Sequence, residues 1–192
     1  MSHPLRLTQA LLDRTAGEKL TLDSVYLQYR QPIERYLTQL SGSPDLAEDL
    51  TQETFARVCA SAQSFRGECS LATWLFRIAR NTYLNSARRP DARRIDTDEL
   101  LAIPDEQAYG DPVQSYASHE QRSVIELVLA QLPERQRSLL LLRDNEDLAY
   151  AEIAEVLSLS ISAVKVNIFR ARLAFRQLYA RYQTGALNDD RV

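Results

Sequence analysis

Apolar residues recur every three or four positions through two long stretches of the chain, the spacing that lines one face of an α-helix. The first stretch covers residues 22–40 and includes Pro32, where we expect a kink or a restart of the helix. A second helix is predicted behind Ser43 and Pro44, because serine caps helices and proline suits the first helical position. Ser70 can cap a third. The apolar positions of these helices are Val25, Tyr29, Ile33, Tyr36, Leu37, Leu40, Leu46, Leu50, Phe55, Val58, Leu71, Trp74, Leu75, Ile78 and Ala79.

A second series of apolar positions starts near residue 120 and predicts four more helices. Pro133 ends the first of them, and residues 139–142 belong to the next. A short helix over residues 150–157 is followed by a break and then by a long helix from Ile161. Ala154 is small enough for the last two helices to cross closely, so they predict a helix-turn-helix whose second helix Ser160 can cap. The stripe before Pro133 consists of Val124, Leu127, Val128 and Leu132.

Charge and composition divide this helical chain into two parts. With only 5 Gly and 7 Pro in 192 residues, we expect an all-α protein. Residues 64–94 hold seven arginines against two acids, residues 95–120 hold seven acids and no base, and residues 161–182 hold five bases and no acid. The acidic zone lacks a sustained apolar period and reads as a flexible linker between two small helical domains. The expected parts are an N-terminal extension (1–21), a first domain (22–90), the acidic linker (91–118), a second domain (119–183) and a tail (184–192).

Several classes of protein are disfavoured by the same sequence. Cys59 and Cys69 form no CxxC motif and lie far from His3 and His119, which argues against a metal site and against a disulfide framework. No apolar run approaches the length of a membrane span, and the N-terminus lacks a signal-peptide core. We therefore expect a cytoplasmic protein that needs no cofactor and no small-molecule substrate.

The long helix from Ile161 carries the strongest candidate chemistry. An α-helix fits the major groove of DNA, where its N-terminal residues reach base edges and its basic side chains contact phosphates. The alternative is a helical hairpin with a solvated basic face. The residues expected on its polar side are Ser162, Lys165, Asn167, Arg170 and Arg172.

The helix behind Ser70 offers a second candidate surface. Arg77, Asn81 and Asn85 are spaced four residues apart and form one outward stripe, whose amides and guanidinium suit bases as well as phosphates. The loop before this helix contains Gly67 and could form a pocket for one unstacked base. Trp74 could stack on a base, but at its helical spacing a core position is favoured. A solvated surface is the alternative for the whole stripe.

A cluster of carboxylates on the helix of residues 45–57 could be read as an acid–base pair of an enzyme. However, Glu48, Asp49 and Glu53 have no histidine partner, no metal-ligand cluster and no apolar pocket near them in the sequence. A charged face that docks on a partner helix is favoured, and we do not expect an enzyme.

Three strings in the sequence resemble a known family, the bacterial RNA polymerase sigma factors of the extracytoplasmic-function (ECF) group. DLAEDLTQETFARV is similar to the polymerase-binding helix, FRGECSLATWLFRIARNTYLN to the promoter-melting region, and LPERQRSLLLLRDNEDLAYAEIAEVLSLSISAVKVNIFRARLAF to the terminal DNA-binding domain. The resemblance covers about residues 22–89 and 119–180. It implies a protein that directs RNA polymerase core to promoters and assists melting, with an anti-sigma factor, often a membrane-bound one in this family, as an expected partner.

The resemblance also implies roles for individual residues. A helix with Asp49, Gln52 and Glu53 would bind the clamp helices of the polymerase, and the second domain would contact the flap. A loop that includes Phe65, Arg66 and Gly67 would capture a flipped base of the minus-ten element, and the stripe of Arg77, Asn81 and Asn85 would line the path of that strand. The minus-thirty-five element would be read by Lys165, Phe169, Arg170 and Arg172, with Arg143 on phosphate.

Three positions depart from the family pattern. Ser158 stands in the helix-turn-helix break where glycine is usual, and a non-glycine residue adopts the left-handed conformation only at some cost. Val166 and Asn167 replace a small polar residue and an arginine, so the upstream DNA sequence that this chain reads is open. A stand-alone helix-turn-helix regulator is the alternative function, although such a protein would not need the surface of the first domain.

Overall fold

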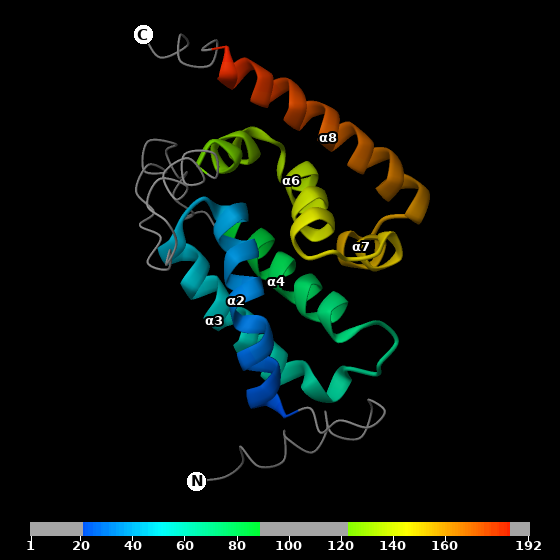
Figure 1. Ribbon diagram of the computed structural model, residues 1–192. Helices are drawn as coiled ribbons and strands as arrows, with labels where there is room; N and C mark the ends of the chain where they lie inside the picture. Colours follow the sequence, from blue (N-terminus) through cyan, green and yellow to red (C-terminus); the bar gives the residue numbers. More distant parts are fainter. Residues whose placement is uncertain (1–20, 89–122, 185–192) are drawn as a thin grey trace, which may run out of the picture.

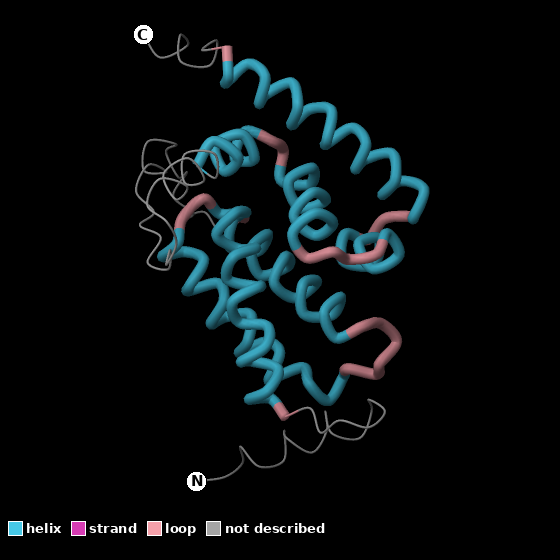
Figure 2. The backbone as a smooth tube through the Cα atoms, viewed as in Figure 1, coloured by secondary structure: helices cyan, strands magenta, loops and turns pink. Residues whose placement is uncertain are grey.

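In the computed structural model the described residues are 21–88 and 123–184, and all regular secondary structure within these two ranges is helical (Figure 1). This confirms the all-α prediction, and Figure 2 shows the short loops that join the helices. The linker and most of both terminal segments predicted above lie outside the described residues. The elements are α2 (Leu22–Ser41), α3 (Pro44–Ser61), a 3-10 turn (Ala62–Ser64), α4 (Leu71–Ala87), a helix whose described part is residues 123–131, α6 (Glu134–Leu140), a π-helical turn (Leu141–Asn145), α7 (Tyr150–Leu157) and α8 (Ile161–Gln183).

The predicted helix starts are confirmed by side-chain caps. Ser43 accepts a hydrogen bond from the amide of Leu46 at 3.3 Å, and Ser70 and Ser160 cap α4 and α8 in the same way. Each such cap contributes about 1 kcal/mol to stability. The expected restart at Pro32 was wrong, because α2 continues through this residue as a single helix.

Helix α4 is surrounded by other helices in the first unit. It packs on α2 and on α3, which also pack on each other. Leu37 of α2, Val58 of α3 and Leu75 of α4 are fully buried where the three meet. Burial of a leucine side chain contributes about 1.5–3 kcal/mol. The polar stripe of α4 is therefore held on a well-packed support.

The second unit contains the predicted helix-turn-helix. α7 has the predicted bounds, α8 begins at Ile161 as predicted, and Ala154 is buried. Ser158 between them has φ 53° and ψ 53°, so it adopts the left-handed conformation in which glycine is the favoured residue. The amide of Leu159 bonds to the carbonyl of Ala154 at 2.8 Å and closes the end of α7. The turn therefore keeps its expected form despite the serine.

The two units are packed against each other rather than held apart. α7 lies on α4, α6 contacts α2, and buried apolar residues form one continuous core across both units. α8 packs on α6 and α7 and lies on the side of the second unit away from α2 and α3 (Figure 1). The fold thus leaves α8 at the periphery and places part of α4 at the junction of the units.

Candidate nucleic-acid interface

Helix α8 buries one face and exposes the opposite one. Val164, Ile168 and Ala171 follow at intervals of four and three residues and are buried against the rest of the second unit. Of the residues expected to face DNA, Ser162, Lys165, Phe169, Arg170 and Arg172 are exposed, whereas Asn167 is half-buried at the flank. The structure therefore brings five of these six side chains to the surface along one helix.

Two of the arginines expected to contact DNA have partners within the second unit. The Arg143 guanidinium donates to the carbonyl of Leu148 at 2.9 Å, pairs with Asp147 at 3.2 Å and lies over the ring of Tyr150. Arg172 pairs with Asp144, where both side chains are 44% exposed. Any phosphate contact by Arg143 would have to accommodate the three groups that already hold it.

The outward stripe on α4 is present as the spacing predicted. Asn81 and Asn85 are exposed, and Arg77, one turn earlier, is half-buried. Trp74 is 6% exposed, so the favoured core position is confirmed. The amide groups of the two asparagines are the best-exposed polar groups of this predicted surface.

The loop before α4 divides into an exposed tip and a buried anchor. Arg66 and Gly67 are exposed, and Gly67 has φ +70°, a conformation that is strained for any residue with a side chain. Phe65 differs from the expectation of a base-contacting residue, because its ring is only 6% exposed and packs on Trp74 with centroids 5.0 Å apart. In this conformation Phe65 anchors the loop to the core.

The two units match two profiles of one protein family. Residues 25–94 match Sigma-70 region 2, and residues 122–175 match Sigma-70, region 4. RNA polymerase sigma factor YlaC of Bacillus subtilis is 33% identical over 160 residues, which cover 82% of this chain and 91% of the relative. The ECF RNA polymerase sigma-E factor of Haemophilus influenzae is 32% identical over 177 residues, which cover 85% of this chain and 90% of the relative.

The chain belongs to the ECF sigma factors. Members of this family are specificity subunits of RNA polymerase rather than catalysts. Two solved structures share the fold of this sigma factor. One is CnrH in complex with the cytosolic domain of CnrY, with a TM-score of 0.62 and 19% identity over 91% of this chain and 94% of that one. The other is RpoE from Bartonella quintana in complex with the anti-sigma factor NepR, with a TM-score of 0.66 and 24% identity over 81% and 94%.

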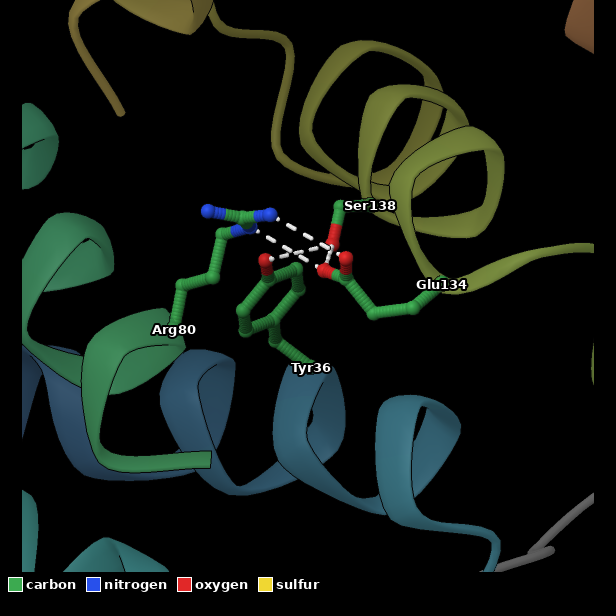
Figure 3. Close-up of polar contacts among 4 residues, drawn as sticks. All are labelled: Tyr36, Arg80, Glu134 and Ser138. Carbon is green, nitrogen blue, oxygen red and sulfur yellow. Dashed lines mark hydrogen bonds and ion pairs between the residues drawn. The ribbon is translucent and has the colours of Figure 1, made fainter. Parts of the chain in front are cut away.

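A chain of polar contacts ties the two units of the sigma factor together (Figure 3). Arg80 of α4 binds both carboxylate oxygens of Glu134 of α6, at 3.0 and 3.1 Å. Ser138 donates to the same carboxylate at 2.7 Å and accepts from the hydroxyl of Tyr36 of α2 at 3.1 Å. Because the Tyr36 side chain is buried, its pKa is raised above the ordinary value. We call these four residues the junction cluster.

Glu152 of α7 makes a second connection to α4. The Ser70 hydroxyl, which caps α4, donates to the Glu152 carboxylate at 2.6 Å, and Thr73 donates to it at 3.2 Å. The hydrogen bond from Ser70, followed by those from the Ala149 amide and Thr73, holds the pKa of Glu152 below its ordinary value, against the opposing effect of burial. The sequence identified Ser70 as a cap, but no local pattern marks a partner 82 residues away.

The surface expected to bind polymerase lies on α3 and faces solvent. Asp49 and Gln52 are exposed, and Glu53 is half-buried and pairs with Arg57 at 2.6 Å. This i,i+4 ion pair is ordinary for a helix surface. Within residues 21–88 and 123–184, no group of His, Cys, Asp and Glu could hold a metal ion, and no helix has both the length and the apolarity to cross a bilayer.

Proposed function

We propose that this sigma factor recognises promoters with two separate surfaces, the stripe of α4 for a melted minus-ten strand and the exposed face of α8 for the duplex of the minus-thirty-five element. The observation that carries the proposal is that α4 in the first unit and α8 in the second each expose a polar or basic face, and that neither face is covered by the packing of the units. The domain boundaries follow the charge zones, with the acidic segment 91–118 as the connection.

The role of α4 is tested through its two exposed asparagines. We expect Asn81→Ala and Asn85→Ala to block open-complex formation and to leave binding to core polymerase unchanged, because both asparagines lie on α4 and the polymerase contact is assigned to α3. Permanganate footprinting and a core-binding assay measure the two steps. Gln131→Ala, which removes an exposed side-chain amide from the other unit, is the matched control. Equal loss of melting and core binding would contradict the assignment.

The role of α8 is tested through Arg170, which is exposed and has no acid near it along the helix. If Arg170 reads a base, Arg170→Ala is expected to weaken binding to the upstream element by about 1–3 kcal/mol and to relax specificity at one position. A uniform loss across all sequences would instead assign it to phosphate. Fluorescence anisotropy of the holoenzyme on upstream duplexes distinguishes the two.

Promoter binding by both surfaces requires the units to part. Elements centred near positions ten and thirty-five are separated by about 85 Å of duplex at 3.4 Å per base pair. Helix α8, the longest described, spans only about 35 Å at 1.5 Å per residue. It packs on α7, which in turn packs on α4. The packed arrangement is therefore that of the chain away from promoter DNA, and the junction cluster must break on binding.

The polymerase contact is assigned to Asp49, Gln52 and Glu53 on α3, and the second unit would contact the flap. In the two solved structures of similar fold, the sigma factor is bound by an anti-sigma factor or by the cytosolic domain of CnrY. These complexes support a protein inhibitor for this chain as well, and a cytoplasmic location follows from its work on polymerase. Run-off transcription with core polymerase, on a promoter upstream of its own gene, tests the whole proposal.

A stand-alone helix-turn-helix regulator would use α8 alone. A gel shift without polymerase separates the two functions, because such a regulator binds duplex DNA tightly by itself, whereas a sigma factor of this design requires polymerase. Tight, polymerase-independent binding to a palindrome would favour the regulator.

A further inference from the structure

Helix α8 has apolar side chains on two opposite faces, and only one of them is explained by the fold. Val164, Ile168 and Ala171 face the core. Val166, Phe169 and Leu173 are 49%, 70% and 46% exposed. At about 100° per residue these three lie within an arc of roughly 60° on the side opposite the core. We call them the outer stripe, and a helix that only supports its own domain would carry polar residues there.

The basic residues beside the outer stripe indicate what kind of partner it binds. Lys165, Arg170 and Arg176 are exposed beside it, and the helix contains no acidic residue from 161 to 183. An apolar stripe between cationic borders fits a polyanion that carries apolar groups between its two charged strands, which describes the major groove of duplex DNA. A purely apolar protein surface would leave these arginines and the lysine without partners.

The 5-methyl of thymine is the apolar group on the base edges of the major groove. The side chains of valine and phenylalanine can neither donate nor accept a hydrogen bond. If cytosine stood in place of thymine, its N4 amino group would lose its hydrating water against these side chains and gain no hydrogen-bond partner. Val166 and Phe169 are the sixth and ninth residues of α8, in the half that reaches base edges in a helix-turn-helix. Their separation of about 4.5 Å along the helix, against about 3.4 Å per base pair, suits neighbouring base pairs.

We propose that Val166 and Phe169 recognise thymine methyl groups in the upstream promoter element. The inference rests on the proposed function of α8 and adds the chemistry of its specificity. Leu173 lies one turn further along the outer stripe, where the helix leaves the base edges, and does not contribute to the discrimination.

The test replaces thymine by deoxyuridine, which removes the methyl group and leaves every hydrogen-bonding group in place. Full-length sigma factor is assembled with core polymerase, and the genomic fragment that this holoenzyme binds best is identified. That fragment is then synthesised with thymine or with deoxyuridine upstream of the minus-ten element only. We expect the Kd to rise about fourfold for each methyl group that loses its contact.

Variants connect the methyl groups to the two side chains. The double variant Val166→Ser with Phe169→Ser should bind the thymine and deoxyuridine probes with equal Kd. Leu173→Ser should keep the wild-type ratio of the two Kd values. All three positions are exposed, so the variants should fold, and their circular dichroism should be that of the wild type. Val166→Thr, which has nearly the same shape as valine, should reduce the ratio in part.

Three outcomes would overturn the inference and leave the proposed function standing. The first is equal binding of both probes by the wild type. The second is a thymine preference that persists in the double variant while its binding to polymerase and its oligomeric state are those of the wild type, since the methyl would then act through DNA shape. The third is the same persistent preference together with weaker binding to polymerase or an altered oligomeric state, which would assign the outer stripe to a protein. If no fragment binds in a polymerase-dependent way, the proposed function itself fails.

Discussion

Helices α4 and α8 both present polar and basic groups to solvent, but they are supported very differently. α4 packs on α2, α3 and α7, so that its exposed stripe is the small remainder of a helix buried on several sides. α8 packs on α6 and α7, and just three of its 23 residues are buried. The comparison supports the proposal that α4 is a firmly packed platform for a melted strand and that α8 is a projecting helix for a groove.

A pair of leucines gives the largest expected contrast between the helices. Leu75→Ala on α4 should lower the free energy of unfolding by about 2–5 kcal/mol, because it leaves a cavity in a core that cannot collapse. Leu173→Ala on α8 should change it by no more than about 0.5 kcal/mol. Urea denaturation followed by circular dichroism measures both. Similar losses for the two variants would mean that α8 is supported as firmly as α4.

A pair of arginines gives the next contrast. Arg80 is 13% exposed in its ion pair with Glu134, and Arg80→Ala should cost about 1–3 kcal/mol, since the carboxylate keeps only the bond from Ser138. Arg172 is 44% exposed in its pair with Asp144, and Arg172→Ala should cost at most about 1 kcal/mol. The same denaturation experiment applies. A larger loss of stability for Arg172→Ala than for Arg80→Ala would show that the ion pair of Arg80 with Glu134 is not the stronger of the two.

The contact of Glu152 with α4 predicts a dependence on pH. The pKa of this carboxyl is lowered in the folded protein, so its contribution to stability is present above the ordinary carboxyl pKa of about 4.3 and is lost as the pH falls below it. Glu152→Gln should therefore be less stable than wild type near neutral pH, and the gap should shrink in acid. Denaturation midpoints of both proteins at several pH values measure this difference in stability. A difference that does not change with pH would show that the charge of the Glu152 carboxylate does not contribute to the contact with α4.

The smallest expected effect concerns the entry into α8. Ser158→Gly should raise the free energy of unfolding by up to about 1 kcal/mol, because glycine adopts the left-handed conformation without strain but loses more backbone freedom on folding. Ala151→Gly, inside α7, is a useful control and should destabilise instead. A destabilising effect of Ser158→Gly would show that the serine side chain supports the turn.

A feature could be predicted from the sequence when the residues that form it are close together along the chain. Helix starts at Ser43, Ser70 and Ser160 depend on bonds to an amide three residues ahead, so the local pattern was sufficient. The bounds of α7 were predicted from its apolar positions, which are also local in the sequence. The burial of Phe65 could not be predicted, because its place in a loop gave no sign that its ring packs on Trp74.

The junction cluster could not be predicted in this way. Its partners are 54 residues apart for Arg80 and Glu134 and 102 apart for Tyr36 and Ser138, and they lie on helices of different units. Ser138 precedes a run of leucines in which nothing marks it as a hydrogen-bonding centre. Only the packing of the two units brings these side chains together.

Arg80 of the junction cluster lies next to the polar stripe of α4. This arginine adjoins Asn81 in the chain, and while the units are packed its charge is neutralised by Glu134. If the units part as proposed, that cation is released beside the stripe proposed to bind the melted strand and can displace a counterion from the single strand. Each added phosphate contact of this kind steepens the dependence of log K on log salt concentration by about 0.7. Separation of the units would thus recruit one more electrostatic contact at the moment of melting.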